Sequence, residues 1–95
     1  MKLIWSPQAA IDLQEMVAYL SAENPRAARA VYQRIEAAAI EMIATPYIGR
    51  PGRVLGTREL VIPNTAYILP YQIRSDWIEI LRVYRAARKW PNQFE

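Results

Sequence analysis

The amino-acid sequence predicts an α+β fold of two layers, in which a pair of antiparallel helices covers one face of a three-stranded antiparallel sheet. Two stretches in the first half carry apolar residues three and four positions apart, the spacing of an amphipathic helix. Three strand-like runs in the second half are joined by connectors short enough for hairpins. Because the chain has 95 residues, we expect residues 1–95 to form one domain.

A short strand and the first helix open the chain. Residues 2–5 (KLIW) consist of a lysine followed by leucine, the β-branched isoleucine and the aromatic tryptophan, a composition that favours a strand. Ser6 and Pro7 then form a helix start, because serine caps free backbone amides and proline fits the first helical position. The apolar spacing that follows predicts a helix over about residues 7–22.

The second helix begins with the same signal, at Asn24 and Pro25. It ends at Thr45, because a residue before proline avoids the helical region. Helices joined by two or three residues must run antiparallel. The many alanines of this second helix suit close packing within the fold, and they equally suit a seat for another chain's helix. Both interpretations stay open at this point.

The second half of the chain predicts a loop, a meander of three strands and a short basic tail. Residues 46–57 hold all three glycines and two prolines, which is typical of a loop. Strands are expected over residues 58–62, 67–73 and 77–84. Pro70 lies in the middle strand, where it cannot donate a hydrogen bond, so we predict a bulge or a missing ladder bond there. Pro91 limits any helix in the tail to about one turn.

Composition excludes several classes of chemistry. The chain has neither cysteine nor histidine, which removes disulfide scaffolds, zinc ribbons, thiol enzymes and histidine-based catalysis. No glycine-rich phosphate loop and no acidic cluster with metal-ligand spacing is present, so we expect no cofactor and no metal. No signal peptide or membrane-spanning run is evident, which predicts a cytoplasmic protein without a membrane partner.

The positive charge is concentrated in the second half. Residues 1–48 carry four basic and five acidic side chains, whereas residues 49–95 carry eight basic and four acidic ones. Interleaved arginine and aromatic residues suit nucleic acid or an acidic protein surface. We therefore predict that the loop and the C-terminal segment contact a target through Arg50, Arg53, Arg82, Tyr84, Arg85, Arg88, Lys89 and Trp90.

Arg58 differs from the other arginines. In a regular strand it shares a face with Leu60 and Ile62, the residues expected to point into the core. A charge on the core side of a sheet needs a partner. We therefore predict that Arg58 forms a structural ion pair with an acidic residue of the helix layer or of a neighbouring strand end.

The order of elements and several short segments resemble the RelE/ParE toxin superfamily, and within it the ParE type. The resemblance covers nearly the whole chain and rests on the segments WSPQA, GRPG, TRELV, YILPY, ILRV and ARKWP. It implies the toxin of a type II toxin–antitoxin module, with a RelE/ParE-like fold.

The resemblance also implies partners. A cognate antitoxin, ParD-like or related, would neutralise the toxin and contact DNA on behalf of the complex, in a hetero-oligomer of toxin and antitoxin. Antitoxins of this kind use helix-in-groove and strand-addition contacts. The antitoxin-binding residues expected on the helix hairpin are Leu13, Val17, Leu20, Ala28, Val31 and Ile35.

Two activities are compatible with the superfamily. ParE-type toxins poison DNA gyrase without catalysis, whereas RelE-type toxins cleave mRNA in the ribosomal A site. The strand and C-terminal cations of RelE fall at Glu59, Val61, Ile68 and Ala86 of this chain, and Glu59 would repel a scissile phosphate. We therefore expect a gyrase poison with no catalytic residue. The alternative endoribonuclease would use Arg82, Tyr84 and Arg85, and a member without toxicity is a third interpretation.

Overall fold

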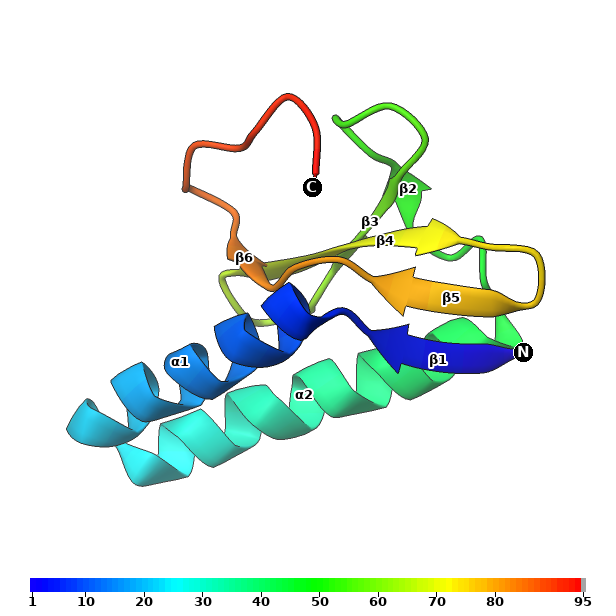
Figure 1. The fold of residues 1–95 in the computed structure, drawn as a ribbon. Helices are drawn as coiled ribbons and strands as arrows, with labels where there is room; N and C mark the ends of the chain where they lie inside the picture. The colour runs from blue at the N-terminus through cyan, green and yellow to red at the C-terminus, as the bar shows by residue number, and fades with distance from the viewer. Residues whose placement is uncertain (95) are drawn as a thin grey trace.

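The computed structural model describes residues 1–94, so residue 95 of the predicted domain lies outside the described residues. It has the predicted α+β fold, with a helix hairpin packed on a mixed sheet (Figure 1). In chain order the elements are β1 (Lys2–Trp5), α1 (Pro7–Glu23), α2 (Pro25–Ala44), β2 (Arg50–Pro51), β3 (Arg58–Val61), β4 (Tyr67–Ile73), β5 (Trp77–Ile80) and β6 (Tyr84–Arg85).

Both helices begin where the sequence predicts. The amide of Ala9 donates to the Ser6 hydroxyl at 3.0 Å, and the amide of Ala27 donates to the Asn24 side-chain oxygen at 3.1 Å. A proline occupies the first turn of each helix. Asn24 is at once the end of α1 and the cap of α2, so a single residue separates the antiparallel pair.

The sheet contains the predicted meander and three further strands. Strands β3, β4 and β5 are consecutive antiparallel neighbours, as expected. β1 extends the sheet as an edge strand parallel to β5, which gives the order β1-β5-β4-β3-β2. The region predicted as a loop contains β2, which pairs with β3 because residues 52–57 fold back as a tight hairpin. β6 pairs with β4 beyond the end of β5.

The predicted irregularity at Pro70 is confirmed. Tyr71 is opposite Ile80, and Ile68 is opposite Tyr84. Two residues of β4 therefore face the three residues 81–83, which is the count of a β-bulge. Leu81 donates to the Pro70 carbonyl at 2.9 Å, and proline has no amide to return the bond. The strand predicted over 77–84 is thus divided into β5 and β6, and β6 extends to Arg85 at the start of the basic tail.

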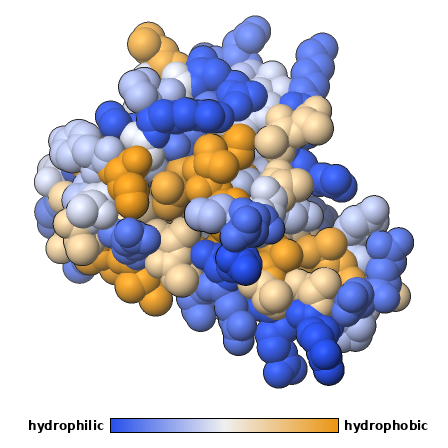
Figure 2. Space-filling model, turned by 180° about the vertical axis from the view of Figure 1, so that it is seen from behind, coloured by the Kyte–Doolittle hydropathy of each residue, from blue (hydrophilic) through white to orange (hydrophobic). Residues whose placement is uncertain are grey.

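The core lies between the helix hairpin and one face of the sheet. Its fully buried members include Ile35, Met42, Leu69, Tyr71 and Ile78. The turn that joins β2 to β3 and the C-terminal segment lie on the side of the sheet away from the helices (Figure 1). Seen from behind, hydrophobic patches over the helices and sheet are interrupted by hydrophilic side chains (Figure 2). No helix within residues 1–94 is long and apolar enough to cross a membrane.

Candidate functional site

An apolar groove of about 740 Å³ runs between α1, α2 and β1. Ten of its twelve lining side chains are apolar or aromatic, and only Gln14 and Glu36 bring an amide and a carboxylate. A groove of this composition suits the apolar face of an amphipathic helix. Its lining consists of Leu3, Trp5, Ala10, Leu13, Gln14, Val17, Ala18, Tyr32, Ile35, Glu36, Ala39 and Ile40.

The groove includes three of the six residues predicted to bind an antitoxin, namely Leu13, Val17 and Ile35. Leu20 and Val31 do not line the groove, although they are half-buried against the core like Leu13 and Val17, and Ala28 is buried. Sequence reasoning missed the contribution of β1, because nothing in the sequence indicates that this strand lies beside the helices. Ile40 of the groove was also not predicted, but the helical period alone could have indicated it, because it lies on the stripe of α2 that contains Ala39 and Ile43.

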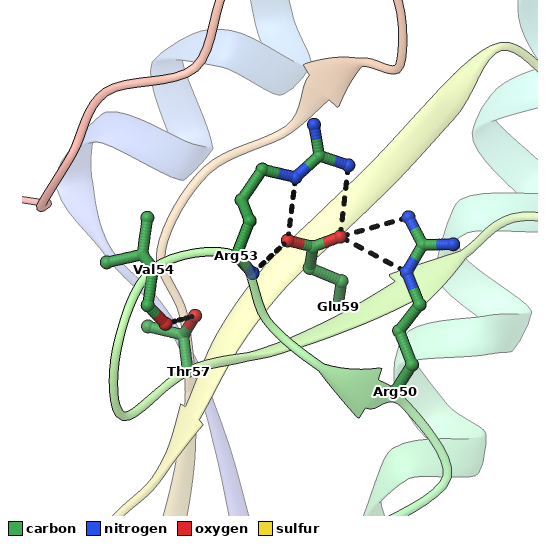
Figure 3. Close-up of polar contacts among 5 residues, drawn as sticks. All are labelled: Arg50, Arg53, Val54, Thr57 and Glu59. Carbon is green, nitrogen blue, oxygen red and sulfur yellow. Dashed lines mark hydrogen bonds and ion pairs between the residues drawn. The ribbon is translucent and has the colours of Figure 1, made fainter.

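A buried carboxylate organises the β2–β3 hairpin (Figure 3). Glu59 is 2% exposed and accepts hydrogen bonds from the guanidinium groups of both Arg50 and Arg53, over distances of 3.0–3.2 Å. The backbone amide of Arg53 donates to the same carboxylate at 2.8 Å. Burial alone would raise the pKa of Glu59, but the hydrogen bonds from Arg53 and Arg50 outweigh it and lower the pKa.

The ion pairs also change the interpretation of Glu59. The sequence suggests a carboxylate that repels RNA phosphate. In the structure its charge is compensated by two guanidinium groups, so direct repulsion is not its effect. It instead holds Arg50 and Arg53 side by side, with their side chains 53% and 42% exposed.

The C-terminal segment joins this cluster through aromatic contacts. Arg53 stacks on Trp90 at 3.7 Å from the ring centroid, and Trp90 meets Tyr84 edge-on at 5.1 Å. Arg88 lies 4.2 Å from the centroid of Tyr84. Lys89 lines the same depression as Arg82, Arg88 and Trp90. The fold therefore brings together seven of the eight predicted target-binding residues, while Arg85 is exposed on β6 and lies beside Arg88 in a separate shallow depression.

Arg82 has a carboxylate partner that the sequence did not indicate. Asp12 of α1 accepts two hydrogen bonds from Arg82, at 2.7 and 2.9 Å, and a third from the amide of Val83 at 2.9 Å. The hydrogen bond to Asp12 raises the pKa of Arg82. Because residues 81–83 form the bulge, the Val83 amide is available to Asp12. Arg82 thus fastens α1 to the sheet.

The prediction for Arg58 is wrong in its partner. Its guanidinium donates to the backbone carbonyls of Gly49 at 2.9 Å and Tyr47 at 3.3 Å, and it lies 5.2 Å from the Tyr47 ring centroid. No acidic side chain within residues 1–94 pairs with it. The chain after α2 passes over Arg58 and supplies carbonyl oxygens, so the charge is satisfied without a carboxylate.

The described residues of these two regions offer cations, aromatic rings and apolar surface to a partner. Within the part of the chain that the structure describes, no group of three acidic side chains could hold a metal ion. Of the three residues that a nuclease would need, Arg82 is bound to Asp12 and Tyr84 is 3% exposed, whereas Arg85 is exposed.

Three comparisons relate this chain to known proteins. Residues 3–90 match the family described as "ParE toxin of type II toxin-antitoxin system, parDE". The chain is 41% identical over 90 residues to "Putative toxin Y4kP" of Sinorhizobium fredii, which covers 95% of this chain and 93% of that protein. It also resembles a solved chain of the chromosomal ParDE toxin–antitoxin system from P. aeruginosa. That match has a TM-score of 0.78 and 30% identity, and it covers 90% of this chain and 95% of that one.

Proposed function

The chain belongs to the ParE toxin family of type II toxin–antitoxin systems, and we propose that it arrests growth by binding and poisoning DNA gyrase in the cytoplasm. The observation that carries the choice of a binding mechanism is the state of Arg82 and Tyr84. An RNA-cleaving site needs groups that reach the scissile phosphate. Arg82 is engaged by Asp12 and Tyr84 is covered by Trp90 and Arg88, so a free set of Arg82, Tyr84 and Arg85 is lacking.

Gyrase poisoning is tested with purified toxin. We expect inhibition of DNA supercoiling by gyrase, and no cleavage of mRNA on translating ribosomes. The matched variants are Arg85→Ala and Tyr84→Phe. Both should still give measurable inhibition of supercoiling if the toxin poisons gyrase, whereas a nuclease would lose mRNA cleavage. Ribosome-dependent mRNA cuts by the wild type that disappear in Arg85→Ala would overturn the proposal and establish the endoribonuclease alternative. Inactivity in both assays, with no growth arrest on induction, would indicate a member without toxicity.

The family implies a cognate antitoxin, and the apolar groove is its proposed seat. An amphipathic helix would place its apolar side chains along Leu13 and Val17, while Gln14 and Glu36 lie at positions to meet polar groups. In this proposal a ParD-like antitoxin contacts DNA for the complex, and the toxin joins it in a hetero-oligomer.

The groove is tested by the pair Leu13→Arg and Ile11→Arg. Ile11 is on α1 and 46% exposed, but it does not line the groove. A charge at Leu13 should weaken antitoxin binding by about thirtyfold or more, as expected of a central apolar contact. The same change at Ile11 should have little effect. Equal affinities of both variants in titration calorimetry would show that the antitoxin binds elsewhere.

A further inference from the structure

Glu59 connects the β2–β3 hairpin to the C-terminal segment, residues 86–94, through the side chain of Arg53. We propose that Glu59 is a positioning residue for target binding: it orients Arg53, Arg53 holds Trp90, and the segment held in this way presents its cations to the target. The inference rests on the proposed function in that a target is bound, but it does not require this target to be gyrase.

Three hydrogen bonds fix Arg53 on Glu59. The Nε and Nη2 atoms of Arg53 donate to the two carboxylate oxygens at 3.0 and 3.2 Å, and its backbone amide donates to the same carboxylate at 2.8 Å (Figure 3). A bidentate contact of this kind fixes the plane of a guanidinium group, which a single point contact does not. Because Glu59 is 2% exposed, any effect of its side chain on a target passes through the residues that it holds.

The oriented guanidinium group of Arg53 holds Trp90. Its central carbon lies 3.7 Å from the centroid of the Trp90 ring, a close cation–π contact. The indole N–H of Trp90 is buried and has no hydrogen-bond partner within residues 1–94. Because no hydrogen bond fixes the indole, its position depends on ring contacts, namely the stack on Arg53 and the edge-on contact with Tyr84 at 5.1 Å.

The position of Trp90 determines where the cations before it lie. Arg88 and Lys89 are exposed and directly precede Trp90 in the chain. All three line one depression, and no described residue of its lining carries a carboxylate. A target that meets cations already in place does not have to order the segment, and such preorganisation raises affinity. A buried residue of β3 can therefore affect binding by the C-terminal segment.

Arg50 provides a comparison within the same cluster. It donates to Glu59 through the same two atoms as Arg53, Nε at 3.2 Å and Nη2 at 3.0 Å. The cation–π contacts within residues 1–94 involve other arginines, so Arg50 has the ion pair without the ring. Matched changes at the two arginines therefore separate the loss of an ion pair from the loss of the contact that holds Trp90.

The test measures solvent exchange of the Trp90 indole proton by NMR on the whole chain, with its signal assigned by its absence in Trp90→Phe. Arg53→Lys keeps the charge but loses the planar group that stacks and makes two bonds. We expect Arg53→Lys and Glu59→Gln to speed this exchange by about fivefold to thirtyfold, the effect of losing a desolvated cation–π contact on an equilibrium. Arg50→Lys should leave the exchange nearly unchanged.

Ile78→Val is the control for a general loss of stability. It removes one methyl group from a fully buried side chain of β5, and it should lower stability while leaving the exchange of the indole proton as in wild type. The amide of Ala86, which donates to the Ala66 carbonyl at 2.8 Å, is the internal reference and should stay protected in every variant.

Growth arrest on induction is the second readout. We expect Arg53→Lys and Glu59→Gln to arrest growth less strongly than wild type, because less of the toxin has the segment in place, whereas Ile78→Val should match wild type. If this pattern holds but wild type spares gyrase, the inference stands and gyrase is the wrong target. Equal exchange of the indole proton in Arg53→Lys and Arg50→Lys would overturn the inference, and so would wild-type growth arrest by Glu59→Gln.

Discussion

Replacing Asp12 by alanine should remove the connection between α1 and the bulge of the sheet. The Asp12 side chain is 10% exposed and that of Arg82 is 28% exposed, so their ion pair is largely shielded from water. The substitution leaves a partly buried guanidinium without its bidentate partner. It also leaves the amide of Val83 without an acceptor, because the bulge has already removed that amide from the strand ladder.

The expected loss of stability follows from these groups. An unsatisfied buried amide costs about 1–3 kcal/mol. Losing the partner of a buried charge costs about 3–5 kcal/mol, but Arg82 can still reach water and its share is smaller. We expect Asp12→Ala to lower the free energy of unfolding by about 3 kcal/mol. For a domain of this size that corresponds to a fall in Tm of about 12–24 °C.

The assay is urea unfolding at neutral pH of Asp12→Ala, Arg82→Ala and the double variant. Arg82→Ala should cost less, about 1–2 kcal/mol, because Asp12 retains the bond from Val83. The cycle should then give a coupling energy of about 1–2 kcal/mol. Glu15→Ala is the control, since Glu15 is exposed on the same helix. If Asp12→Ala unfolds at the same urea concentration as Glu15→Ala, the reasoning from the bulge is refuted.

Three further predictions concern the hairpin and the core. The lowered pKa of Glu59 means that its stabilisation is present above about pH 4.5 and disappears as the pH falls below that value; urea midpoints of wild type and Glu59→Gln should therefore converge in acid. Tyr71→Phe should lower the free energy of unfolding by about 2–3 kcal/mol, because the buried hydroxyl accepts a hydrogen bond from a backbone amide at 2.9 Å and donates one to a carbonyl at 2.7 Å. Tyr67→Phe should lower it little, because that hydroxyl has no such bonds within residues 1–94. Equal losses of stability in the two variants would contradict this prediction. Gly52→Ala should lower Tm, because its Cβ would lie 2.9 Å from the Thr57 carbonyl oxygen, and an unchanged Tm would show that the hairpin yields easily.

Features that depend on neighbouring residues could be predicted from the sequence. Ser6 and Asn24 cap the helices through bonds that reach three residues along the chain, so the residues themselves indicate the structure. The missing hydrogen bond at Pro70 is likewise predictable from the residue itself, since no tertiary contact can supply the amide that proline lacks. The bulge at residues 81–83, on the neighbouring part of the sheet, follows from this missing amide.

Features that depend on contacts between distant residues could not be predicted from the sequence. Asp12 and Arg82 are separated by 70 positions, and each has the composition of an ordinary exposed charge. The sequence correctly indicates that an arginine of the sheet layer needs a partner, but it assigns that need to Arg58, which backbone carbonyls satisfy. Glu59 has the outward position in the strand alternation, and only the fold-back of β2 buries it.

These two kinds of interaction lead to different expectations for the arginines. Arg82 donates two short hydrogen bonds, from its Nε and Nη2 atoms, to the single carboxylate of Asp12. Arg50 and Arg53 share one carboxylate, and their side chains are 53% and 42% exposed, against 28% for Arg82. Substituting Arg82 should therefore reduce stability and affect toxicity only through folding. Substituting Arg50 leaves Glu59 with the three hydrogen bonds from Arg53, so it should reduce toxicity by more than its smaller fall in Tm explains. A ranking of the eight predicted target-binding residues by charge alone would treat these arginines as equivalent, and the partners within the fold are what separate them.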